Sequence, residues 1–190
     1  YSSLALGPHT FAVRATDAAG NPDPSPAEAS WTIVTTNGGT FLAEADTYVV
    51  ENRATKNFGS TTQLIADGGS GIRHEALLKF SVSGATGAVT SAKLRLWITN
   101  GTGNGPEVFL TEAGWAETVV TWNTRPAITS GVIADTGAIP QGAWYEIDVT
   151  SAITGDGTYA FVLSSISTDA LKFASRETTT RPELAIVWDS

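Results

Sequence analysis

The chain has 190 residues, of which 42% are hydrophobic and 16% charged, with a formal net charge of -8 and no cysteine. This composition is typical of a globular protein and excludes an intrinsically disordered one. The acidic balance argues against a nucleic-acid ligand, and the absence of cysteine excludes a disulfide framework and the commonest structural zinc sites. No apolar run is long enough to span a bilayer, so no membrane partner is expected.

Residues 1–36 are predicted to form a separate unit built around a β-hairpin. Alternating side chains predict strands over 10–15 and 31–34, and the prolines between them exclude a central strand there. The stretch 7–21 resembles the pattern G-x-H-T-F-x-V-x-A-x-D-x-A-G-N of bacterial immunoglobulin-like modules, which occur as spacers in exported proteins. The resemblance implies the C-terminal part of such a module. It is either truncated or supported by its neighbour, because an isolated hairpin is marginally stable in water.

Residues 37–40, Asn-Gly-Gly-Thr, are the predicted linker, and residues 41–190 form the predicted main domain. Short apolar runs alternate there with Asp-Gly and Asn-Gly turns, which predicts an all-β fold, a sandwich or a barrel. The one helical turn expected lies over 150–153. The predicted strands are 47–50, 63–66, 77–82, 92–98, 108–111, 119–122, 144–149, 159–164 and 184–188.

The clearest alternation lies in 92–98. Its even-numbered residues are all apolar and predict a core-facing side, whereas Lys93, Arg95 and Trp97 point the other way. Lys79 has the same position on the preceding strand, opposite the apolar side of 77–82. Cations and a tryptophan on a non-core face are unusual in an acidic chain, and this contrast is the main functional signal.

A series of short motifs runs along residues 41–189. They are ADTYV at 45–49, NFGS at 57–60, ALLKF at 76–80, SAKLRL at 91–96, WAE at 115–117, VTWNTRP at 120–126, WYEIDVT at 144–150, SRE at 175–177 and PEL at 182–184. This series resembles the DNRLRE domain family, although the six letters that name the family are absent. The family includes jelly-roll carbohydrate-binding modules, some of which act on alginate and are attached to polysaccharide-degrading enzymes. The resemblance implies an antiparallel β-sandwich of jelly-roll type in a secreted or cell-surface bacterial protein.

A polysaccharide ligand would need rings and cations. An aromatic ring stacks on sugar C–H groups, while Arg and Lys pair with uronate or sulfate oxygens. The candidate ligand-binding residues are Lys79, Lys93, Arg95 and Trp97, with Arg73 and Lys56 from adjoining loops. Two alternatives remain open: the patch is a solvated outer face with cations lying over Trp97, or the two strands belong to opposite sheets, which would separate Lys79 from Arg95.

Catalysis is not expected. His9 and His74 are the only histidines, and no nucleophile motif such as G-x-S-x-G is present. Glu146 and Asp148 lie two apart on a predicted strand, where neighbours span only the low end of the carboxylate separation in glycoside hydrolases. A solvated strand edge is favoured for this pair, or a cap in which Asp148 accepts hydrogen bonds from the turn at 150–152.

Binding a structural calcium ion is a better explanation of carboxylates in this chain than catalysis. Calcium takes six to eight oxygen ligands, often in loops at a sandwich rim. Jelly-roll sugar-binding domains often hold calcium near their joined termini, and the resemblance therefore implies Glu44, Asp46 and Asp189 as candidate ligands. No D-x-D-x-D-G loop is present, and the full ligand set stays open. No other cofactor is expected.

The favoured hypothesis is a non-catalytic carbohydrate-binding module for an anionic polysaccharide such as alginate. Its partners would be the polysaccharide and other domains of a larger exported enzyme or surface protein, and its role would be to concentrate an attached domain on its substrate. The alternative is a structural spacer or adhesion module without a glycan ligand. The two differ in whether the cations and Trp97 converge on one open face.

Overall fold

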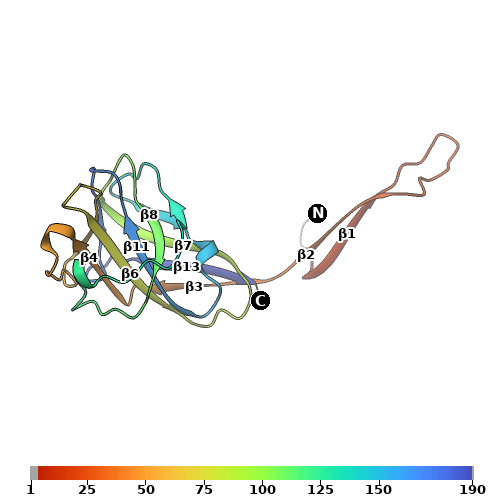
Figure 1. Cartoon of the computed structure of the whole chain (residues 1–190). Helices are drawn as coiled ribbons and strands as arrows, with labels where there is room; N and C mark the ends of the chain where they lie inside the picture. Colours follow the sequence, from red (N-terminus) through yellow and green to blue (C-terminus); the bar gives the residue numbers. More distant parts are fainter. Residues whose placement is uncertain (1–3, 190) are drawn as a thin grey trace.

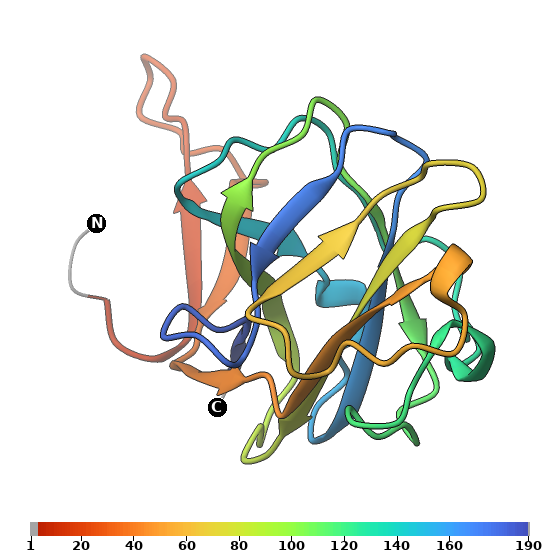
Figure 2. The same ribbon diagram turned by 90° about the vertical axis from the view of Figure 1, so that its left-hand side faces the viewer.

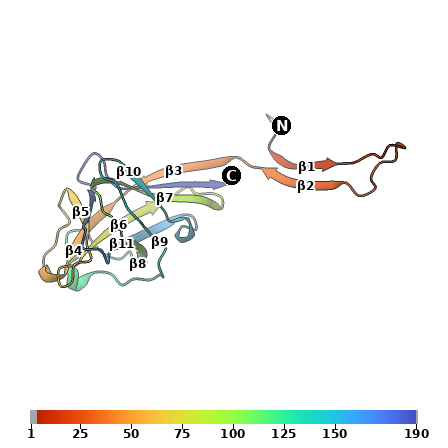
Figure 3. The same cartoon turned by 90° about the horizontal axis from the view of Figure 1, so that it is seen from above.

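The computed structural model describes residues 4–189 as a β-hairpin that projects from a β-sandwich (Figure 1). In the hairpin, β1 (Gly7–Val13) pairs antiparallel with β2 (Ala27–Ile33), and Gly7 lies opposite Ile33. The loop beyond β1 is ordered by Asp17, whose Oδ1 accepts the amides of Ala19 and Asn21 at 2.9 and 2.8 Å. Figure 3 shows the hairpin extended away from both sheets.

The sandwich consists of a six-stranded and a five-stranded sheet, in which every pair is antiparallel (Figures 1 and 2). This confirms the antiparallel sandwich of jelly-roll type. The six-stranded sheet contains β3 (Thr36–Leu42), β13 (Glu183–Asp189), β7 (Val89–Asn100), β12 (Leu171–Ala174), β5 (Gln63–Ala66) and β10 (Trp144–Asp148). The five-stranded sheet contains β4 (Ala45–Val50), β6 (His74–Val82), β11 (Gly157–Ser164), β8 (Glu107–Thr111) and β9 (Ala134–Asp135).

The main core fills the space between the sheets. The even-numbered side of 92–98 is fully buried there, as the alternation predicts, and Leu78, Phe80, Phe161 and Leu163 enter the same cluster from the other sheet. Because neighbouring residues on a strand face opposite sides, these contacts fix which side of each sheet points outward.

The outer face of the five-stranded sheet is also covered. Leu77 and Val162 lie on that face and pack with Val120, Trp115 and Trp122 in a second buried cluster. The last three residues come from the long connection between β8 and β9, which lies over the sheet. The outward side of β7 in the six-stranded sheet has no such cover, because its side chains belong to neither core cluster of residues 4–189.

Within residues 4–189, three short 3-10 helices complete the fold: η1 (Glu51–Arg53), η2 (Trp122–Thr124) and η3 (Thr150–Ala152). The last confirms the expected turn near 150. The strand predicted at 119–122 is wrong, because Thr121 and Thr124 form a reciprocal cap that starts η2. No helix within residues 4–189 has the length and apolar character needed to cross a membrane.

Residues 37–40 were expected to be a linker, and this expectation is wrong. They belong to β3, where Gly39 lies opposite Ile186 of β13. A Cβ on Gly39 would lie 3.2 Å from the Phe41 ring and 3.3 Å from Trp188, so a close approach of side chains accounts for the glycine. The relation of residues 1–36 to immunoglobulin-like modules stays a prediction.

Candidate functional site

Lys93, Arg95 and Trp97 lie together on the outward side of β7, as expected. Strand β10 runs beside them, with Trp144 opposite Trp97, and the two rings meet edge to face with their centroids 5.8 Å apart. The Arg95 guanidinium lies 5.0 Å from the centre of the Trp144 ring. We call Lys93, Arg95, Trp97 and Trp144 the sheet-face patch.

Both cations of the sheet-face patch are paired with carboxylates. Lys93 Nζ lies 2.6 Å from Asp148 Oδ2, while Arg95 binds Glu146 at 3.1 Å and also Glu183. Two cations against three carboxylates leave this face slightly negative. Because Glu146 and Asp148 are engaged in these pairs, the strand-edge interpretation of the two carboxylates is favoured over a catalytic one.

Lys79 lies apart from this patch, because β6 and β7 belong to different sheets. Its side chain is 14% exposed and lies under the connection that covers the five-stranded sheet. The ammonium donates a hydrogen bond to the Trp115 carbonyl at 2.8 Å and lies 3.8 Å from Glu44 Oε1. Lys79 therefore holds the covering segment in place and is not presented to a ligand.

Arg73 and Lys56 lie at one end of the sandwich, where η1 and η2 are neighbours (Figures 1 and 2). The Asn123 amide donates to the Ala54 carbonyl at 3.1 Å and joins the two segments. Two guanidinium groups lie near the centre of the Trp122 ring, that of Arg125 at 3.9 Å and that of Arg73 at 5.3 Å. We define the end patch as Arg53, Lys56, Arg73, Trp122 and Arg125.

The end patch holds cations that no carboxylate neutralises. Arg73 pairs with Glu51 at 3.3 Å and Arg125 with Glu75 at 3.0 Å. Within residues 4–189, Arg53 has no ion pair, and Lys56 has only a cation–π contact, 4.9 Å from the centre of the Phe58 ring. Four cations against the two carboxylates that pair with them leave the end patch positive in a chain whose net charge is -8.

Two hollows mark the end patch. One of about 360 Å³ is lined by residues that include Glu75, Trp122, Asn123 and Arg125. The other, of about 270 Å³, is lined by residues that include Tyr48, Arg53, Phe58 and His74. Burial lowers the pKa of His74, so its ring is neutral at pH 7, and burial raises the pKa of Glu75 above its ordinary value.

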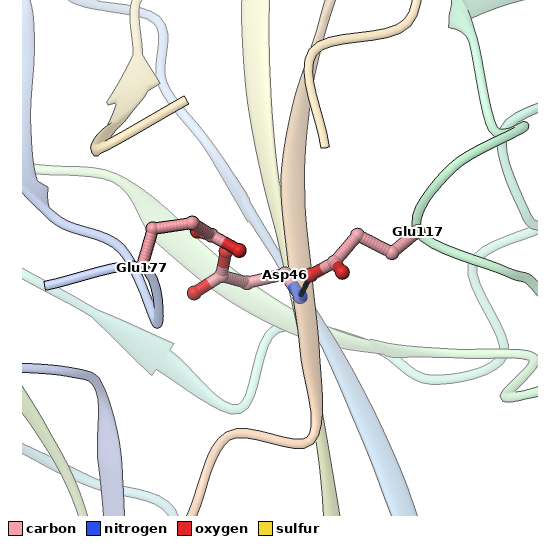
Figure 4. Close-up of side chains that lie close together, drawn as sticks. All are labelled: Asp46, Glu117 and Glu177. Atoms are coloured by element: carbon pink, nitrogen blue, oxygen red, sulfur yellow. Dashed lines mark hydrogen bonds between the residues drawn. The ribbon is translucent and has the colours of Figure 1, made fainter. Parts of the chain in front are cut away.

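Three carboxylates from distant parts of the chain meet beside β4. Asp46 comes from β4, Glu117 from the connection before η2, and Glu177 from the connection between β12 and β13 (Figure 4). One oxygen from each lies within 4.8 Å of the others. We call these residues the carboxylate cluster.

Asp46 is the buried member of the carboxylate cluster. It is 1% exposed; its Oδ2 accepts the Arg176 amide at 2.7 Å, and its Oδ1 has no hydrogen-bond partner. Burial raises the pKa of Asp46 to about 7. Arg176 Nη1 lies 2.8 Å from Glu117 Oε2 and 3.6 Å from Glu177 Oε1.

The structure does not bring Glu44 and Asp189 to this cluster. Glu44 accepts a hydrogen bond from Ser81 at 2.7 Å, and Asp189 lies at the end of β13, opposite Thr36. In the part of the chain that the structure describes, neither belongs to a group of three possible ligands. Of the three predicted metal ligands, only Asp46 lies in a carboxylate cluster.

Sequence reasoning missed Glu117, Glu177, Arg53 and Arg125 as candidates. Glu117 and Glu177 both lie in the quoted motifs WAE and SRE, whose acidic residues we did not connect with Asp46 in ADTYV. Arg53 lies between two of the motifs, and Arg125 lies within the motif VTWNTRP. The shared signal was an acidic residue in each of the motifs ADTYV, WAE and SRE.

The sequence model of carbohydrate-binding module family 96 matches residues 37–187 of this chain. The match runs from β3 into β13 and thus includes the sheet-face patch, the end patch and the carboxylate cluster. No curated protein matches the chain.

Proposed function

The chain belongs to carbohydrate-binding module family 96, and from that premise we propose that it binds an anionic polysaccharide, such as alginate, at the end patch without cleaving it. The observation that carries this proposal is the pair Arg53 and Lys56, two cations that no carboxylate neutralises within residues 4–189. Their charge is available to the carboxylates of a uronate chain.

Electrostatics favour the end patch over the sheet-face patch for a polyanion. A local excess of positive charge attracts an anionic chain even when the whole protein is acidic. At the sheet-face patch the carboxylates of β10 and β13 already occupy Lys93 and Arg95, so a uronate would have to displace them.

Recognition at the end patch rests on charge and hydrogen bonding more than on stacking. Trp122 and Phe58 are 8% and 6% exposed, so neither ring offers a broad platform to a sugar. The Trp122 ring instead orders the guanidinium groups of Arg73 and Arg125 beside it. Because these two guanidinium groups are paired with Glu51 and Glu75, the charge offered to the ligand is that of Arg53 and Lys56.

A wider role follows from the resemblance of the chain to exported modules. We infer that it is part of a secreted or cell-surface bacterial protein and that it raises the effective concentration of an attached domain on the polysaccharide. The projecting β1–β2 hairpin, with Trp31 and Val13 exposed, suits a connection to such a neighbour.

The proposal can be tested by affinity electrophoresis of the whole chain. The gels contain alginate, polygalacturonate, neutral xylan or no polymer. We expect alginate or polygalacturonate to retard the chain and Arg53→Ala/Lys56→Ala to reduce the retardation strongly. The double variant Arg14→Ala/Arg181→Ala removes the same charge elsewhere and is expected to be retarded like the parent.

The sheet-face patch provides the competing result. Its two tryptophans are half-buried, so part of each ring is accessible to a neutral sugar. Retardation by neutral xylan that Trp97→Ala/Trp144→Ala abolishes would move the site to that face. Absence of retardation by every polymer would overturn the proposal in favour of a spacer or adhesion module.

A further inference from the structure

We propose that the carboxylate cluster of Asp46, Glu117 and Glu177 is a binding site for one hard divalent cation of the Ca²⁺ class. The site is distinct from the one proposed for polysaccharide, because none of its three residues belongs to the end patch or the sheet-face patch. It unites β4 with two connections that are far apart in the sequence (Figure 4).

The first argument is the unpartnered oxygen of Asp46. The side chain is almost completely buried, and Oδ1 has no hydrogen-bond donor, although Oδ2 accepts the Arg176 amide. A buried carboxylate oxygen without a donor or cation is unfavourable, because it has lost water without replacement. Figure 4 shows the carboxylates of Asp46 and Glu177 turned toward each other.

The second argument is the charge. Three carboxylates and the Arg176 guanidinium that contacts two of them sum to about -2 when all are ionised. Arg176 Nη1 approaches one oxygen of Glu117 and one of Glu177, and it leaves Asp46 Oδ1 unpaired. One divalent cation would neutralise this net charge of about -2.

The third argument is the geometry and type of the ligand atoms. Calcium lies about 2.3–2.6 Å from its oxygen ligands, so oxygens on opposite sides of the ion are separated by about 5 Å. One oxygen from each residue of the cluster lies within 4.8 Å of the others, which fits around a single ion. All three ligands are carboxylates, which suit hard cations and disfavour zinc or copper sites built from nitrogen and sulfur.

Neighbouring hydrogen bonds hold the ligands in place. The Asp46 amide donates to Glu117 Oε1 at 2.8 Å, and Ser175 Oγ donates to Glu177 Oε2 at 2.7 Å. The Asn57 side chain donates to the Glu117 carbonyl at 2.7 Å and fixes the backbone of that segment. A bound cation would therefore join an already positioned set of ligands.

The site can be tested by thermal denaturation and calorimetry of the whole chain. The protein is first stripped of metal with EDTA and then dialysed free of chelator. We expect Ca²⁺ at a hundredfold excess over its Kd to raise the Tm by about 5–10 °C, since a ligand that binds only the folded state stabilises it. Calorimetric titration should give one ion per chain. Asp46→Asn and Glu117→Gln are expected to remove the response, and Glu112→Gln, an exposed change in the same connection, to retain it.

Each other result overturns the proposal. An unchanged Tm with Ca²⁺, Mg²⁺ and Mn²⁺ would show that a proton or Arg176 alone balances the cluster. A response to Zn²⁺ only would contradict the hard-cation class, and a Ca²⁺ response retained in Glu117→Gln would place the ion elsewhere. If Asp46→Asn does not fold, Glu177→Gln decides, because that side chain is 25% exposed and tolerates change better. Alginate retardation measured in the presence of EDTA tests the proposed function separately, because it does not require a bound cation.

Discussion

Lys79 Nζ donates a hydrogen bond to the Trp115 carbonyl at 2.8 Å, and the same ammonium lies 4.9 Å from the centre of the Trp115 ring. This double contact ties the connection between β8 and β9 to the outer face of β6. It explains why a cation occupies a strand position that alternation marks as outward and why that position is nevertheless shielded from a ligand.

The substitution Lys79→Met tests this structural role. Met keeps most of the apolar stem but leaves the Trp115 carbonyl without its charged donor. We expect the free energy of unfolding to fall by about 2 kcal/mol, since hydrogen bonds to charged groups contribute about 1.5–3 kcal/mol. Urea denaturation at pH 7 measures the loss.

Lys93→Met is the matched control for Lys79→Met. Lys93 is paired on an exposed sheet face with an Asp148 side chain that is 62% exposed, so we expect a loss of at most about 1 kcal/mol. Equal losses in the two variants would contradict the anchoring role of Lys79.

The sequence predicted the sandwich well because its strands have one clear apolar side. In β7 the alternation is unbroken from Ala92 to Ile98, and the structure buries that side completely. The outward position of Arg95 and Trp97 follows from the same period of two. Local patterns of this kind need only neighbouring residues, and they are therefore readable without knowledge of the tertiary fold.

The sites were harder to predict because they depend on which segments meet. Alternation puts Lys79 and Arg95 on outward faces but does not say that β6 and β7 belong to different sheets. Asp46 and Glu177 are separated by more than half of the chain, and only the return of the β12–β13 connection brings them together. Strand pattern carries no information on such long-range contacts.

Gly59 is predicted to be intolerant of any side chain. A Cβ at this position would lie 2.3 Å from the Glu117 carbonyl oxygen, so Gly59→Ala must displace the backbone that carries Glu117. We expect a loss of about 1–3 kcal/mol in the free energy of unfolding, which is typical of overpacking. Thermal and urea denaturation measure it.

Gly137→Ala is the control for Gly59→Ala. No heavy atom lies within 4 Å of a Cβ at Gly137, so the substitution should leave stability unchanged or raise it slightly. If Gly59→Ala proved as stable as Gly137→Ala, the close packing of the 57–60 motif against Glu117 would be refuted.

The pair Lys93 and Asp148 predicts an acid-dependent loss of stability. Hydrogen bonds from Lys93 and Thr150 hold the pKa of Asp148 well below its ordinary value. Because the folded pKa is below the unfolded one, the stabilisation is present above the unfolded value of 3.8 and disappears as the pH falls below it. Asp148→Asn should be slightly less stable than the parent at pH 6, and the difference should shrink steadily as the pH falls below 3.8. A difference that grows on acidification, measured by urea unfolding across this range, would reverse the assigned sign.

Salt dependence distinguishes charge-based binding at the end patch from stacking. If Arg53 and Lys56 each contribute about 0.5–1 kcal/mol, their joint removal weakens alginate binding by roughly 5–30-fold. Rising ionic strength has a similar effect, because the Debye length shrinks from about 30 Å at 0.01 M to about 3 Å at 1 M. Lys56→Arg keeps the charge and should retain binding, whereas Lys56→Glu should weaken it further than Lys56→Ala. Affinity electrophoresis at increasing NaCl concentrations measures the effect. Retardation that survives 1 M NaCl, or that is equal in Lys56→Arg and Lys56→Glu, would contradict binding through these cations, since stacking on Trp97 and Trp144 is insensitive to salt.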